Sequence, residues 1–167
     1  AEDADKVSLV REINAGGSKN IADACKRLNC KMLYLSTDYV FDGQGTEPWK
    51  PDCKEFNPLN VYGQTKLEGE LAVAGTLEKY YIVRIAWVFG LNGKNFIKTM
   101  LNVAKTHDKL TVVCDQIGTP TYCYDLDNCQ QYCIKENFIN PPRQYISNLK
   151  NSYNVLLSLF HGIGERY

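Results

Sequence analysis

The stretch that decides the fold is residues 31–39, which read KMLYLSTDY. After Lys31, residues 32–35 are apolar at positions that face both sides of a strand, a pattern typical of a strand covered on both faces in a parallel sheet. A second run of this kind follows at Tyr80 to Ile85, and helical patterns precede, separate and follow the two runs. This alternation predicts an α/β fold with a doubly wound parallel sheet.

The first helical pattern covers residues 5–14, is interrupted at Gly16-Gly17 and resumes to residue 29 with a face formed by Ile21, Ala24, Cys25 and Leu28. The loop at residues 36–58 is rich in Gly and Pro, and a loop of this length in a compact domain is usually functional. No domain boundary is evident, so a single domain over residues 1–167 is predicted. The remaining predicted elements are helices at 59–77, 95–106, 125–135 and 153–160, and strands at 110–114 and 144–146.

The charge balance of the chain excludes whole classes of partner. The 167 residues carry 19 basic and 19 acidic side chains, so the net charge is zero and no basic excess is present for nucleic acid. Hydrophobic residues make up 44% of the chain, which argues against disorder. No apolar run approaches the ~20 residues that span a bilayer, so no membrane contact is expected.

The cysteines and histidines disfavour a metal site or a hydrolase. The seven cysteines form no C-x-x-C pair, and the two histidines lie in no catalytic context. Cys129 and Cys133 are four residues apart on a predicted helix and can share one face. We expect the cysteines to be small buried hydrophobes in a reducing cytosol.

Candidate chemistry lies just after the first strand, because sites in an open parallel sheet form beyond the carboxyl ends of the strands. Ser36, Thr37, Asp38 and Tyr39 stand there. Farther along the chain, Tyr62 and Lys66 are four residues apart and share a helix face.

An ammonium beside a tyrosine lowers the tyrosine's pKa, so Tyr62 and Lys66 form a plausible acid-base pair, and Thr37 can hold the same substrate oxygen. The pair alone is weak evidence, since a chain with 11 tyrosines contains such spacings by chance. The alternative is a surface helix with an extended lysine. The position of the pair after a buried strand favours the catalytic interpretation.

Several motifs together closely resemble the dTDP-4-dehydrorhamnose reductase family, extended short-chain dehydrogenases that act on nucleotide sugars. The resemblance covers residues 1 to about 160 and implies a Rossmann-like fold. The motifs are STDYVFDG at 36–43, PLNVYGQTKLEGE at 58–70, RIAWVFG at 84–90, NF with KTML at 95–101, and DQIGTPT at 115–121.

The resemblance implies that NADPH or NADH reduces the C4 ketone of dTDP-4-dehydro-L-rhamnose to dTDP-L-rhamnose, in the cytoplasm. Tyr62 would then give a proton to the new alkoxide. Lys66 would lower the pKa of Tyr62 and hold the nicotinamide ribose. Thr37 would bind the reacting oxygen, and Asp38 and Trp87 would contact the sugar.

Three further residues are weaker candidates. Tyr39 and Asn95 are explained nearly as well by an exposed aromatic and a helix N-cap. Arg84 lies in a predicted strand, where a structural role suffices. The resemblance also leaves a homodimer and a magnesium requirement open.

Two alternatives to the reductase remain. Related dehydratases carry an Asp-Glu pair after the Thr, whereas here Asp38 is followed by Tyr39, which favours reduction without elimination. Another nucleotide-sugar short-chain dehydrogenase stays open. A non-catalytic homologue, similar to the regulatory subunit of methionine adenosyltransferase, stays open as well.

The glycine-rich turn that binds a dinucleotide is absent, since none of the 12 glycines has the G-x-x-G-x-x-G or G-x-G-x-x-G spacing. By resemblance we expect that turn and the first strands upstream of Ala1, so the chain is interpreted as the C-terminal part of a longer enzyme. In the strand order 3-2-1-4-5-6, the strand at 31–35 would pair with a strand of that segment. We expect this chain alone to associate through the open edge and to bind NADPH weakly.

Overall fold

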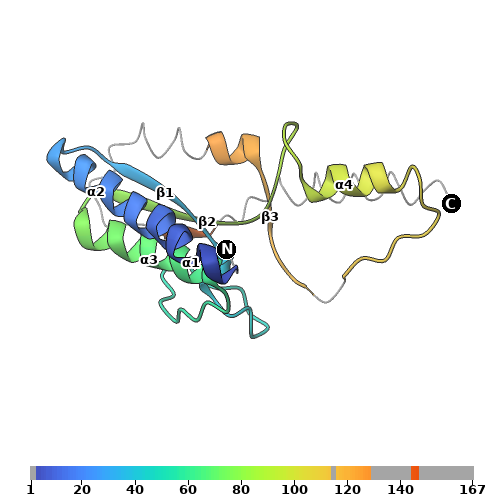
Figure 1. Cartoon of the computed structure of the whole chain (residues 1–167), viewed down its shortest axis with the longest axis horizontal. Helices are drawn as coiled ribbons and strands as arrows, with labels where there is room; N and C mark the ends of the chain where they lie inside the picture. The colour runs from blue at the N-terminus through green and yellow to red at the C-terminus, as the bar shows by residue number, and fades with distance from the viewer. Residues whose placement is uncertain (1–2, 114–115, 129–143, 147–167) are drawn as a thin grey trace. The chain divides into compact units, whose positions relative to one another are not determined.

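The computed structural model describes residues 3–113, 116–128 and 144–146 (Figure 1). They fall into two compact units, one within residues 1–84 and 133–146 and the other within 85–132 and 147–167. The prediction of a single domain over residues 1–167 stays a prediction. The predicted helix at 153–160, the second half of the helix at 125–135, and Cys114, Cys129 and Cys133 lie outside the described residues.

The first unit opens with one uninterrupted helical run. The run consists of the 3-10 turn η1 (Ala4–Lys6), α1 (Val7–Arg11), the π-helical turn η2 (Glu12–Gly16) and α2 (Gly17–Arg27). The predicted interruption at Gly16-Gly17 is therefore wrong, because the helix continues through both residues. This is the place where the helix widens into a π turn, a feature that adds one residue to the turn.

The predicted face of α2 is only partly buried. Cys25 packs against the core, whereas Ile21 and Leu28 are 55% and 77% exposed. The fully buried residues of the helix are Ser18 and Ala22.

The sheet of the first unit is built on two strands. β1 (Met32–Thr37) neighbours β2 (Tyr80–Phe89), and β4 (Gln144–Ile146) pairs in parallel with Ile82–Arg84 of β2. In the described part of the chain, β2 is the one neighbour of β1. The predicted α/β class is confirmed, and the predicted strand at 144–146 is found with the same bounds.

Helix α3 (Val61–Thr76) agrees with the predicted helix at 59–77. Its N-terminus is capped by Asn60, whose side-chain oxygen accepts a hydrogen bond from the backbone N–H of Gly63 at 2.7 Å. Helices α2 and α3 lie side by side along β1 (Figure 1). The core between them consists of Ala22, Met32, Tyr34, Val73, Leu77 and Ile82.

The second unit contains the end of β2, α4 (Phe96–Val103) and β3 (Pro120–Tyr122). The predicted strand at 110–114 is wrong, because residues 110–113 form no strand and their side chains are exposed. β3 instead pairs in parallel with β2, with Ala86 opposite Pro120. A short apolar run does not by itself indicate a strand, and Pro120 is accepted as the first residue of one, where its missing N–H matters least. Residues 123–128 are helical, two residues earlier than predicted.

Two glycines let α3 approach its neighbours closely. A Cβ atom at Gly63 would lie 2.1 Å from the backbone oxygen of Tyr39, and one at Gly69 would lie 2.3 Å from the hydroxyl of Tyr34. Real Cβ atoms do not reach such distances. The contacts of α3 with Tyr39 and with Tyr34 of β1 are therefore possible only because positions 63 and 69 lack a side chain.

Replacing Gly63 with Ala tests this close approach. We expect Gly63→Ala to lower the free energy of unfolding by about 1 to 3 kcal/mol, because backbone has to move to make room. The matched control is Gly75→Ala in the same helix, where a Cβ meets nothing within 4 Å. That variant should gain up to about 1 kcal/mol from the better helix propensity of Ala. Urea unfolding measures both, and equal effects of the two variants would contradict the packing described.

Candidate active site

The hydroxyl of Thr37 is held in place where β1 ends. The side chain caps the 3-10 turn η3 (Asp38–Val40) by accepting a hydrogen bond from the backbone N–H of Tyr39 at 3.3 Å. It donates to a carboxylate oxygen of Asp38 at 3.0 Å. Thr37 is buried, whereas Asp38 and Tyr39 are exposed. The segment that the sequence singled out is thus a fixed, polar end to a strand.

Tyr62, in the first turn of α3, has a half-buried side chain with 39% of its area exposed. Its ring meets the ring of Tyr39 edge-on, with 6.0 Å between the centroids. Burial raises the pKa of Tyr62 above its ordinary value, and a side-chain hydrogen bond with Thr37 opposes that shift. Tyr62 therefore carries its proton at neutral pH and lies beside a second hydroxyl.

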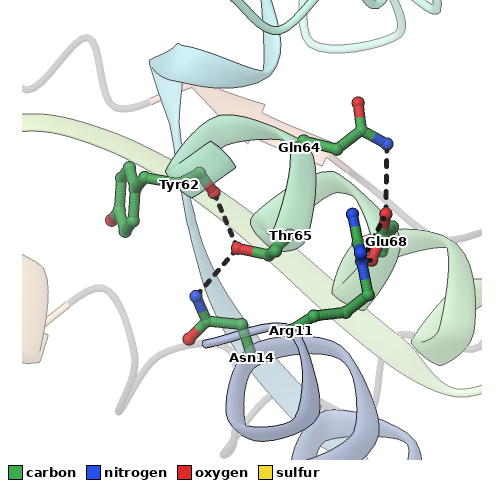
Figure 2. A network of polar contacts seen from close by, with 6 residues as sticks. All are labelled: Arg11, Asn14, Tyr62, Gln64, Thr65 and Glu68. Carbon is green, nitrogen blue, oxygen red and sulfur yellow. Dashed lines mark hydrogen bonds and ion pairs between the residues drawn. The ribbon is translucent and has the colours of Figure 1, made fainter. Parts of the chain in front are cut away.

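The backbone of Tyr62 is anchored to the N-terminal helices through a chain of polar contacts (Figure 2). The hydroxyl of Thr65 donates to the backbone oxygen of Tyr62 at 3.1 Å and accepts from the side-chain amide of Asn14 at 3.0 Å. Arg11 binds Glu68 at 2.9 Å in the same network. The Tyr62 ring points away from these contacts, so they hold the helix backbone and do not involve the phenol (Figure 2).

The ammonium of Lys66 contacts two neighbouring residues of β1. It donates to the backbone oxygen of Leu35 at 2.7 Å and lies 4.2 Å from the centroid of the Tyr34 ring. In return, the Tyr34 hydroxyl donates to the backbone oxygen of Lys66 at 3.2 Å. Burial lowers the pKa of Lys66, and the nearby Glu70 partly opposes this shift. Lys66 thus stands at the carboxyl half of β1 with its charge directed at the strand.

The predicted influence of Lys66 on the pKa of Tyr62 stays a prediction. Burial and the charge of Asp38 raise that pKa, and the hydrogen bond with Thr37 lowers it. The ammonium of Lys66 donates to the carbonyl of Leu35 in this structure.

Asp38 keeps an accessible carboxylate beside these groups. Desolvation by the surrounding protein raises its pKa, and the hydrogen bond from Thr37 opposes the rise. The carboxylate is therefore positioned by Thr37 and remains open to solvent.

A buried ion pair supports the helix that carries Tyr62 and Lys66. Arg84 of β2 binds both carboxylate oxygens of Glu70, at 2.9 and 2.7 Å, and the two side chains are 1% and 2% exposed. The guanidinium lies about equally close to the rings of Phe41 and Phe56, at 5.1 and 5.0 Å from their centroids. Arg84 thus has the structural role considered from the sequence.

Sequence reasoning missed Glu70 and Tyr34, which position the candidate site. A signal for Glu70 was present, because a Glu four residues after Lys66 lies on the same helix face and an Arg in an apolar strand requires a buried partner. Nothing in the local pattern of β1 distinguished Tyr34 from its apolar neighbours.

The remaining candidates belong to the second unit. Asn95 caps α4, accepting from the backbone N–H of Lys98 at 3.1 Å and donating to the backbone oxygen of Gly90 at 2.9 Å. This confirms the N-cap interpretation. Trp87 has a left-handed backbone with φ of 46° and is 46% exposed, and its ring lies so close to Gly118 that a Cβ there would be 2.8 Å away. The first unit brings together Thr37, Asp38, Tyr39, Tyr62 and Lys66.

The described residues contain neither a metal-binding cluster nor a membrane-spanning helix. No group of three or more His, Cys, Asp and Glu side chains in these residues is arranged to hold a metal ion. In the same residues, no helix has both the length and the apolar character needed to cross a membrane.

Parallel strand pairing, with helices packed along β1, defines a protein of the doubly wound α/β class. The model of the family described as the RmlD substrate binding domain matches residues 1–153. The chain belongs to this family.

Named relatives agree with this assignment. A dTDP-4-dehydrorhamnose reductase of Sinorhizobium fredii is 44% identical over 116 residues, which are 68% of this chain and 38% of that protein. A crystal structure of such a reductase from Clostridium acetobutylicum is similar with a TM-score of 0.84 and 41% identity, covering 98% of this chain and 60% of that one. The reductase from Bacillus anthracis in complex with NADP has a TM-score of 0.83 and 34% identity, over 96% and 57% of the two chains. The Rossmann-like fold class is thereby confirmed. The chain spans about two fifths of the length of this curated relative.

Removing one partner of the buried ion pair should be strongly destabilising. We expect Glu70→Ala to lower the free energy of unfolding by about 3 to 5 kcal/mol, because it leaves the guanidinium of Arg84 buried without its counter-charge. The matched control is Asp23→Ala, which removes the exposed pair with Lys19 and should cost about 0.5 kcal/mol. Urea unfolding measures both. The double variant Glu70→Met with Arg84→Met should lose less than Glu70→Ala, and a larger loss would contradict the desolvation argument.

The buried phenol of Tyr34 predicts a loss of stability in alkali. Burial raises the pKa of Tyr34 from its ordinary value of 10.0 to about 12, so the unfolded chain releases the proton first. The contribution of Tyr34 to stability is therefore complete below about pH 10 and declines as the pH rises from about 10 to 12. Tyr34→Phe removes this decline. Unfolding free energies of the two proteins, measured along that pH interval, should converge as the pH rises, and a constant difference would contradict the prediction.

Proposed function

We propose that the protein is a dTDP-4-dehydrorhamnose reductase, which uses NADPH or NADH to reduce the C4 ketone of dTDP-4-dehydro-L-rhamnose to dTDP-L-rhamnose in the cytoplasm. The names of the relatives support the reaction. The observation that carries the proposal is the arrangement at the end of β1, where Lys66 is bound to Leu35 and the phenol of Tyr62 lies beside Thr37.

The residues at the end of β1 fit a nicotinamide cofactor. The cofactor supplies a hydride when it is bound. An ammonium group has three hydrogen-bond donors, and the contact with Leu35 uses one of them. Lys66 is thus able to hold the ribose hydroxyls of a nicotinamide while it stays attached to the strand.

Tyr62 is the proposed proton donor. Its raised pKa keeps the phenol protonated at neutral pH, which is the state that a donor needs before the reaction. As the C4 oxygen of the sugar gains negative charge, Tyr62 gives it a proton and becomes a phenolate. The hydroxyl of Thr37, which donates to Asp38 in this structure, can turn that proton to the same oxygen.

Substrate contacts are proposed for Asp38 and Trp87, both of which have accessible side chains. The carboxylate of Asp38 can accept hydrogen bonds from sugar hydroxyls, and the indole of Trp87 can pack on a sugar ring. The residue after Asp38 is Tyr39, so the second carboxylate that an elimination needs is missing at this place. This supports reduction without elimination.

The central test replaces the proposed proton donor. We expect Tyr62→Phe to lower kcat by about 100- to 10,000-fold, the range typical for loss of a general acid, with the fold unchanged. Oxidation of NADPH in the presence of dTDP-4-dehydro-L-rhamnose measures turnover, and circular dichroism checks the fold. The assay uses this chain joined behind the N-terminal segment of a curated relative, because the chain spans about two fifths of such a protein.

The matched control is Tyr124→Phe, which removes the hydroxyl of an exposed tyrosine outside the candidate site and should leave kcat unchanged. Equal activity of Tyr62→Phe and the unmodified protein would exclude Tyr62 as the donor. A joined protein that binds NADPH but turns over no substrate would favour the non-catalytic alternative.

A further inference from the structure

The end of α2 has the geometry of a Schellman motif. The backbone N–H of Asn29 donates to the oxygen of Lys26 at 3.2 Å, and that of Cys30 donates to the oxygen of Cys25 at 3.0 Å. Asn29 between them has a left-handed backbone, with φ of 50°. These two hydrogen bonds and a left-handed residue after the helix define the motif.

A Schellman motif brings two particular side chains together, one in the last turn of the helix and the other two residues after its cap. In most proteins both are apolar, but here they are Cys25 and Cys30. Cys25 is partly buried and packs against the core cluster of Ala22, Met32 and Tyr34, whereas Cys30 is exposed. Burial raises the pKa of the Cys25 thiol, and a hydrogen bond between the two thiols adds to the rise.

We propose that Cys25 and Cys30 form a redox-active dithiol that closes to an intramolecular disulfide by exchange with a small disulfide such as glutathione disulfide. The site is independent of the proposed reductase activity. Both thiols are free in this structure, one is accessible to the oxidant, and the helix cap already holds the second beside it. Proximity imposed by the backbone is what favours an intramolecular disulfide over a mixed one.

The exchange balances in two steps. The thiolate of Cys30 attacks one sulfur of glutathione disulfide, forming a mixed disulfide and releasing one glutathione thiolate. Cys25 then loses its proton to solvent and attacks the sulfur of Cys30, releasing the second glutathione. The protein loses two electrons and two protons, and one glutathione disulfide becomes two glutathione molecules.

The positions of the lysines and arginines make the product easy to detect. Trypsin cuts after Lys19, Lys26, Arg27 and Lys31, so it separates the two cysteines into the peptides 20–26 and 28–31. The protein is incubated with glutathione disulfide, remaining thiols are alkylated, and the digest is analysed by mass spectrometry. We expect these two peptides joined by a disulfide as the main product. Cys53 and Cys123, the other free cysteines of the described residues, serve as internal references and should carry glutathione or the alkylating group.

A pair of variants at Asn29 tests the role of the helix cap. Asn29→Gly keeps the left-handed conformation and should form the linked peptides at the rate of the unmodified protein. Asn29→Val disfavours that conformation and should slow the linkage by about tenfold. Circular dichroism confirms that both variants are folded. Persistence of a glutathione adduct on Cys30 without linked peptides would overturn the proposal, and so would equal rates in the two Asn29 variants.

Discussion

The ion pair between Glu70 and Arg84 is the constraint on which the first unit depends. Both groups are almost completely buried, so each requires the other to remain charged inside the protein. The pair joins the middle of α3 to β2, and the aromatic rings of Phe41 and Phe56 fix the guanidinium from the side. Only one rotation of α3 about its axis allows this contact. Because Lys66 is one turn before Glu70 and Tyr62 one turn before Lys66, the same rotation places all three on the side of α3 that faces the sheet, with Glu70 against β2 and Lys66 against β1.

The ion pair determines the rotation of α3 about its axis, and the glycines determine how closely α3 approaches β1. Gly63 and Gly69 allow the helix to approach within a distance that any side chain would prevent. At that depth Tyr34 and Lys66 exchange contacts, the phenol with a helix carbonyl and the ammonium with a strand carbonyl. The ammonium is thus part of the packing as well as of the candidate site. Lys66 is therefore held at the carboxyl half of β1, and burial raises the pKa of Tyr62 beside it.

The parts of the structure that follow from local pattern were predictable, and those that depend on a partner far away in the sequence were not. The cap at Asn95 follows from a short-range hydrogen bond with Lys98, and α3 agrees with the predicted helix at 59–77. The strand predicted at 110–114 shows where local pattern is insufficient. An apolar run becomes a strand only when another strand is available to pair with it. In this structure β2 pairs with Pro120–Tyr122 instead. The core packs on Ala22 as well as on Cys25 of the predicted face, because β1 and α3 decide which side of α2 is covered. In the site, residue types were predictable from motifs, but the hydrogen bond from Lys66 to the carbonyl of Leu35 joins segments that are distant in the sequence.

The two chemically distinct sites of the first unit lie at opposite ends of β1. Cys30 is two residues before the strand begins at Met32, and Thr37 is its last residue. Tyr34 connects them, because it belongs to the cluster against which Cys25 packs and also holds Lys66. The backbone of the helix cap brings Cys25 and Cys30 together, and Cys25 already packs against the cluster that contains Tyr34. A disulfide before the start of β1 would therefore link the strand covalently to α2, at the end of the strand opposite Thr37. We expect it to stabilise the first unit and to leave the contacts of Lys66 unchanged.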